Sequence, residues 1–168
     1  MLRFIVLVLL PVVANVVVGD DLESDEFNCE PRYWTSGPEF PCYGHLSTGF
    51  KCNNSFLSIS DTPFYDCSNV SLFWNYPMYN LIVNIEAANY TNLKQPFAVT
   101  LSNTFGLPAY RIYPNGQEVL ISSTTAEQVV QTSDENYQVV LKIQGPERVT
   151  LYGAFIEYQV APAYYENF

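Results

Sequence analysis

The chain has 168 residues, of which 48% are hydrophobic and 14% are charged, and it carries a net charge of −10. This length suits one domain with a single core. Its seven Lys and Arg residues are not clustered, which argues against a nucleic-acid partner and against binding to an anionic membrane surface.

Residues 1–19 have the features of a secretory signal peptide. A positively charged start leads into an apolar run over residues 4–18, and small residues precede an acidic stretch. The run is interrupted by Pro11 and is shorter than the roughly 20 residues that span a bilayer, so no membrane span is expected. We therefore expect cleavage after Gly19, with Ala14 as the alternative site, and a secreted, extracellular protein.

Residues 20–28 are acidic, and a run of carboxylates of this kind is predicted to be a flexible, solvated segment. Its spacing matches no calcium-binding loop. The cysteines further along the chain are too widely spaced for a zinc site, and the chain has one His, so neither a metal ion nor another cofactor is expected.

Residues 29–67 hold every cysteine of the chain together with many prolines and glycines, a composition that favours loops held by disulfides. An even number of cysteines in an exported chain predicts two disulfides. The cysteines are Cys29, Cys42, Cys52 and Cys67. Three pairings are open, and the sequential one, Cys29–Cys42 with Cys52–Cys67, is preferred. We interpret the many aromatic residues of this segment as a small core beneath the loops, with an aromatic ligand-binding surface as the alternative.

Three Asn-x-Ser/Thr sequons predict N-glycosylation at Asn53, Asn69 and Asn89, because exported chains are exposed to the enzyme that glycosylates this sequence. Asn53 adjoins Cys52, where disulfide formation competes with the modification. Asn69 and Asn89 are therefore the stronger candidates.

From residue 68 onward the hydrophobic pattern has a period of two, which is typical of strands with one buried face. We predict strands over residues 71–76, 81–86, 97–102, 110–112, 118–122, 126–131, 137–143 and 149–160. The pair Asn115-Gly116 favours a tight hairpin turn. Short strands at roughly ten-residue spacing, without an amphipathic helix, predict an all-β, antiparallel β-sandwich over residues 68–162 and a C-terminal tail over 163–168.

Three segments of this region carry a likeness to a known family. A cysteine opens the first strand (Cys67–Trp74), a Val-Thr-Leu-Ser stretch lies in the middle (Phe97–Gly106), and an aromatic strand closes the region (Tyr152–Tyr158). In these features residues 52–162 resemble a CUB-like domain, in particular the divergent secreted CUB-like proteins of nematodes. The resemblance implies a jelly-roll-like sandwich, an extracellular binding role and a link to responses against pathogens.

The chain also departs from the pattern of that family. CUB domains usually have a second disulfide in their later half, whereas this chain has no cysteine after Cys67. The acidic set with which many relatives bind calcium cannot be mapped onto Asp134, Glu135 or the other carboxylates. The resemblance therefore does not imply calcium-dependent binding.

No recognisable catalytic arrangement is present in the sequence. His45 is the one histidine, so any Ser-His or Cys-His mechanism would have to use it, and there is no Gly-x-Ser-x-Gly elbow. We therefore expect no enzymatic activity. The sequence favours a secreted, non-catalytic protein that binds an extracellular protein or glycan, of the kind that the resemblance links to innate immunity. The alternatives are a structural, matrix-associated secreted protein and a secreted hydrolase that uses His45.

Overall fold

The structure of this chain is a computed structural model that describes residues 29–86, 95–102, 106–122 and 128–163. The predicted signal peptide, the acidic segment, Asn89 and residues 164–168 lie outside these ranges. Within the ranges, the regular secondary structure is almost entirely strand, and the one exception is a three-residue 3-10 turn. None of the helical structure found there is long and apolar enough to cross a membrane.

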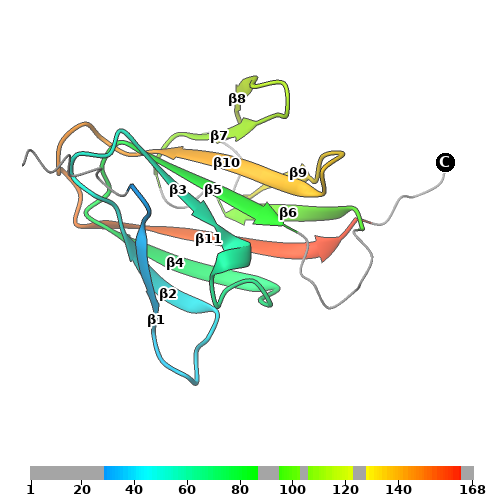
Figure 1. The fold of residues 1–168 in the computed structure, drawn as a ribbon, viewed down its shortest axis with the longest axis horizontal. Helices are drawn as coiled ribbons and strands as arrows, with labels where there is room; N and C mark the ends of the chain where they lie inside the picture. The colour runs from blue at the N-terminus through cyan, green and yellow to red at the C-terminus, as the bar shows by residue number, and fades with distance from the viewer. Residues whose placement is uncertain (1–28, 87–94, 103–105, 123–127, 164–168) are drawn as a thin grey trace, which may run out of the picture.

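Eleven strands form two sheets in the described part of the chain. The six-stranded sheet contains, in spatial order, β1 (Arg32–Thr35), β2 (Tyr43–Ser47), β4 (Asn69–Asn75), β11 (Gly153–Pro162), β6 (Phe97–Ser102) and β9 (Gln128–Thr132). The five-stranded sheet contains β3 (Asn54–Ser58), β5 (Asn80–Glu86), β10 (Gln138–Gln144), β7 (Ala109–Ile112) and β8 (Glu118–Leu120). One short 3-10 turn, η1 (Ile59–Asp61), follows β3. In Figure 1, β5 and β10 lie over β4 and β11, which makes a sandwich-like all-β fold.

Alternate residues of the central strands fill the space between the two sheets. On β5 the residues Leu81, Val83 and Ile85 are buried, and on β4 Leu72 and Trp74 are fully buried. Burial of one large apolar side chain contributes about 1.5–3 kcal/mol, so these residues hold the sheets together. The period of two that the sequence shows from residue 68 onward is thereby confirmed as the pattern of the core.

The predicted hairpin turn is present between β7 and β8, which pair antiparallel. Gly116 has a φ of +80°, and its N–H donates to the carbonyl of Tyr113 at 2.8 Å. Glycine tolerates this left-handed conformation because it lacks a Cβ atom. The last strand differs from the prediction in its start, since β11 begins at Gly153 rather than at residue 149.

Residues 29–67 are rich in turns and irregular structure, as their composition suggested, but they also contain the strands β1, β2 and β3, which were not predicted. Each of these strands is only four or five residues long, too short to show a clear period. The sheets are also mixed rather than antiparallel, since β2 pairs parallel with β4 and β3 pairs parallel with β5. The chain passes from β2 to β3 in the other sheet before it reaches β4, so it re-enters the first sheet in the same direction.

All four cysteines form disulfides, as predicted, but the sequential pairing is wrong. The bonds are Cys29–Cys52 and Cys42–Cys67, with Cα atoms 5.5 Å and 5.7 Å apart. Cys42 and Cys67 come shortly before the adjacent strands β2 and β4, so parallel pairing brings them together. Cys29 and Cys52 come shortly before β1 and β3, which are edge strands of different sheets, so this bond links the two sheets at one side.

Arg111 of β7 lies in the core with 1% of its surface exposed, and no sequence pattern singled it out. Its guanidinium donates to the carbonyls of Gln138 (3.0 Å) and Val140 (3.2 Å) and reaches the carboxylate of Asp134 at 3.5 Å. Burial lowers the pKa of Arg111, and the nearby charge of Asp134 opposes this shift. Asp134 also accepts the backbone N–H of Gln138 at 3.3 Å, so the buried cation is joined to the turn between β9 and β10.

Candidate functional site

The outer face of the six-stranded sheet carries ring-bearing side chains on four neighbouring strands. The register aligns Trp34 of β1 with His45 of β2, and His45 with Phe73 of β4. Phe73 in turn faces Phe155 of β11. Alternate residues of a strand point to opposite faces, and the residues beside these in β2, β4 and β11 are buried, so the rings point away from the core. We call Trp34, His45, Phe73 and Phe155 the aromatic row.

The rings of the aromatic row contact one another in order across the sheet. The ring centroids of Trp34 and His45 are 5.5 Å apart, with planes inclined by 7°. The centroid distance is 5.8 Å from His45 to Phe73 and 4.9 Å from Phe73 to Phe155. Aromatic pairs of this kind contribute about 0.5–1.5 kcal/mol beyond the area they bury. Trp34 and Phe155 nevertheless keep 48% and 53% of their surface exposed, so the row is ordered and open to solvent.

Gly153 of β11 makes room for the central ring of the row. A Cβ atom at this position would lie 2.1 Å from Cζ of Phe73, so any other residue would displace the ring. Tyr152 extends the aromatic surface, because its ring centroid lies 6.0 Å from that of Phe73 and 5.3 Å from that of Tyr76. Tyr152 and Tyr76 are both exposed. A contiguous exposed apolar patch of this kind is typical of an interaction site.

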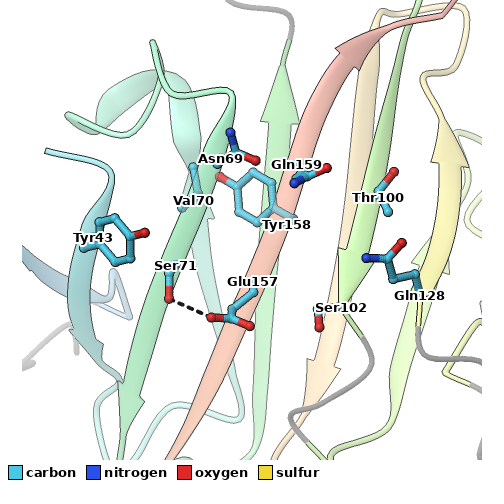
Figure 2. A pocket seen from close by; sticks show the side chains of 10 residues that line it. All are labelled: Tyr43, Asn69, Val70, Ser71, Thr100, Ser102, Gln128, Glu157, Tyr158 and Gln159. Carbon is cyan, nitrogen blue, oxygen red and sulfur yellow. Dashed lines mark hydrogen bonds between the residues drawn. The ribbon is translucent and has the colours of Figure 1, made fainter. Parts of the chain in front are cut away.

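A shallow groove of about 250 Å³ lies on the same face, and Figure 2 shows the side chains around it. We call it the polar groove, and its lining residues are Tyr43, Asn69, Val70, Ser71, Thr100, Ser102, Gln128, Glu157, Tyr158 and Gln159. Tyr43 pairs with Ser71, and Ser71 pairs with Glu157. Each of these three is two residues along its strand from a member of the aromatic row, so the two rows are about 7 Å apart.

Glu157 is the charged side chain of the polar groove. The hydroxyl of Ser71 donates to its Oε1 at 3.2 Å, drawn as the dashed line in Figure 2. The other polar lining groups are hydroxyls and amides, and neither lysine nor arginine is among the lining residues. The groove therefore has a negative electrostatic character with many neutral hydrogen-bonding groups.

Tyr158 contributes to the lining although only 3% of its surface is exposed. Its hydroxyl is buried without a hydrogen-bond partner in the part of the chain that the structure describes. Burial raises the pKa of this hydroxyl above its ordinary value. The group is therefore neutral at physiological pH.

The structure brings two of the sequence-predicted residues to this face. Asn69, the first residue of β4, is exposed and lines the polar groove. His45 stands in the aromatic row, where its ring contacts are with Trp34 and Phe73. Asn53 is exposed elsewhere, next to Cys52 and β3 of the other sheet.

The aromatic residues of the cysteine-rich segment do not form the small core that we expected beneath its loops. Five of them are between 48% and 68% exposed: Trp34, Phe40, Tyr43, Phe50 and Phe56. Phe64 is fully buried and joins the main core instead. The short strands β1, β2 and β3 lie at or near sheet edges, and in the described ranges no further layer covers their outer sides. The alternative interpretation, an aromatic surface, fits these residues better.

Comparison with protein-family models gives no match for this chain, and comparison with curated proteins gives none either. The likeness to CUB-like domains therefore rests on the sequence features of residues 52–162. Within the described ranges, no three His, Cys, Asp or Glu side chains are grouped as metal ligands. The candidate site is thus defined by the aromatic row and the polar groove.

Proposed function

We propose that this protein is a secreted, non-catalytic binding protein of CUB-like type, and that it binds its partner through the outer face of the six-stranded sheet. The aromatic row is the observation that carries the proposal. Its rings are held in mutual contact, yet Trp34 and Phe155 stay about half exposed. Burying aromatic surface is favourable, so an ordered aromatic surface that the fold leaves open is available to a partner.

The class and the location of the protein are inferred from independent features. An all-β fold of two packed sheets is compatible with the jelly-roll-like sandwich that the resemblance implies. Two disulfides are compatible with an oxidising, extracellular environment. Residues 1–19, with their pattern of a signal peptide, supply the route of export. A role in the response to pathogens comes from the resemblance alone.

The surroundings of His45 support binding rather than hydrolysis. A general base must lie within hydrogen-bond reach of the group that it deprotonates. The His45 ring contacts two aromatic rings, with centroids 5.5 Å away in Trp34 and 5.8 Å away in Phe73. We therefore assign His45 to the binding surface.

The proposal can be tested with two matched substitutions on opposite faces of the protein. Phe155→Ser removes a ring of the aromatic row, and Phe56→Ser removes a ring of the five-stranded sheet; the two side chains are 53% and 52% exposed. Binding to a panel of purified extracellular proteins and immobilised glycans is measured by surface plasmon resonance. We expect Phe155→Ser to weaken binding about tenfold or more, because aromatic residues dominate interface energies, and Phe56→Ser to leave it unchanged.

Thermal unfolding of both variants serves as the control for folding. Phe155→Ser loses the ring contact with Phe73 and is expected to lower the free energy of unfolding by about 0.5–1.5 kcal/mol, whereas Phe56→Ser is expected to change it by about 0.5 kcal/mol or less, so both variants should stay folded at the assay temperature. If the wild-type protein binds no member of the panel, or if both variants weaken binding equally, the proposed binding face is wrong.

A further inference from the structure

We propose that the polar groove and the aromatic row together bind uncharged glycans built from pyranose sugars. This inference rests on the proposed function and names the class of ligand that the same face recognises. Three properties of the face carry it: the chemistry of the groove, the position of the aromatic rings and the distribution of charge.

The polar groove supplies the mixture of donors and acceptors that sugar hydroxyls require. A sugar hydroxyl both donates and accepts, as do hydroxyl and amide side chains, whereas an ionised carboxylate only accepts. The groove contains all three kinds of group, including Thr100, Gln159 and Glu157. Oε1 of Glu157 accepts from the hydroxyl of Ser71 at 3.2 Å. A carboxylate has lone pairs for several hydrogen bonds, so Glu157 can also accept from a sugar hydroxyl, in a charge-assisted bond that is stronger than a neutral one.

The aromatic row supplies the apolar part of the site. A pyranose ring has C–H faces that pack against aromatic rings, while its hydroxyls project from the rim. Phe155 and Glu157 are two residues apart on β11 and point to the same side, about 7 Å from each other along the strand. One sugar ring can therefore rest on Phe155 while its rim hydroxyls reach Glu157 and Ser71. Apolar surface beside a few placed polar groups is the usual composition of a small-ligand site.

The negative charge of this face favours uncharged glycans over other extracellular ligands. The lining of the groove includes the carboxylate of Glu157 and no basic residue, and the whole chain carries a net charge of −10. Sulfated, sialylated or uronic-acid glycans would be repelled by this face. An extended peptide would pair through its backbone with a sheet edge, whereas here the backbones of β4, β11 and β6 already pair with one another.

Asn69 determines how the site must be tested. It lines the groove and begins the sequon Asn69-Val70-Ser71. A glycan attached to its side-chain nitrogen would start inside the groove and compete with a free glycan for the same space. The Asn69→Gln variant keeps an amide at this position but cannot be glycosylated, and it is the background for the binding experiment.

The experiment measures binding of the full-length secreted Asn69→Gln protein to two sets of immobilised probes. One set holds uncharged oligosaccharides of glucose, mannose and N-acetylglucosamine, and the other holds heparin and hyaluronan. We expect saturable binding to the uncharged set only. Adding Glu157→Ala or Phe155→Ser is expected to weaken it about tenfold or more, and adding Phe56→Ser is expected to leave it unchanged.

Each outcome decides between the two proposals. If no uncharged probe binds, or if Glu157→Ala and Phe155→Ser leave the affinity unchanged, the glycan site is wrong. If Phe155→Ser then still abolishes binding to an extracellular protein, the proposed function stands without the glycan site. If neither probe set nor any extracellular protein binds, the proposed function fails as well.

Discussion

Replacing Tyr158 by phenylalanine is expected to stabilise the protein. Tyr158 is 3% exposed, and its hydroxyl lies in the core without a hydrogen-bond partner among the described residues. A buried polar group without a partner costs about 1–3 kcal/mol. Removing one oxygen leaves a void of roughly 10 Å³, and at about 24 cal/mol per Å³ this costs only about 0.2 kcal/mol. The net gain is therefore about 1–3 kcal/mol.

Thermal and urea unfolding measure this gain. In a domain of this size Tm rises by roughly 2–4 °C for each kcal/mol of stabilisation, so an increase of at least about 2 °C is expected. Tyr43→Phe is the matched control, because the Tyr43 side chain is 56% exposed and loss of its hydroxyl is expected to change stability by about 0.5 kcal/mol or less. A Tyr158→Phe variant that is less stable than the wild type would show that the hydroxyl has a partner, and it would refute this reasoning.

The buried hydroxyl of Tyr158 also predicts how the difference in stability between the wild type and Tyr158→Phe depends on pH. Burial raises the pKa of Tyr158 in the folded state, whereas in the unfolded chain it is about 10. Below pH 10 the hydroxyl is neutral in both states and has no effect on the pH dependence. Above pH 10 it ionises in the unfolded chain only, so the wild type loses up to about 1.4 kcal/mol per pH unit that Tyr158→Phe does not lose. A stability difference that stays constant from pH 8 to pH 11 would contradict this assignment.

Two further substitutions test the interior. Replacing both Cys42 and Cys67 by serine is expected to lower the free energy of unfolding by about 3.5 kcal/mol, because the disulfide closes a loop with a sequence separation of 25. Urea denaturation measures this loss, and a loss below about 1 kcal/mol would contradict the expectation. Arg111→Met is expected to cost about 3–5 kcal/mol in the same assay, because it leaves the carboxylate of Asp134, whose side chain is only 9% exposed, without its cation. An unchanged or higher stability would exclude this role.

The strands after residue 68 could be predicted because burial there follows a local period. Val83 and its neighbours two residues away face the core, and this alternation is visible without knowledge of any other strand. The strands before residue 68 could not be predicted in the same way. β2 and β3 are five residues long and pair with β4 and β5, so their stability depends on residues distant in the chain.

The candidate site depends on the order and register of the strands, which a local sequence pattern does not reveal. Trp34 and Phe155 come from nearly opposite ends of the described chain, and they share a face only because β1, β2, β4 and β11 are neighbours. The sequence contains eight glycines and does not distinguish Gly153 from the others, because its role depends on the Phe73 ring that packs against it from another strand. The abundance of aromatic residues in the sequence was the one signal that pointed toward this surface.

The two disulfides interleave along the chain, because Cys42 lies within the loop that Cys29–Cys52 closes, and Cys52 lies within the loop that Cys42–Cys67 closes. Under the proposed export, the chain enters an oxidising compartment during translation, and Cys29 and Cys42 are both made before Cys52. The strands β4 and β5, with which β2 and β3 pair, are translated only after all four cysteines. A bond formed in order of emergence is thus a wrong one that must be exchanged, so we expect the yield of native protein to depend on disulfide isomerisation and not on oxidation alone.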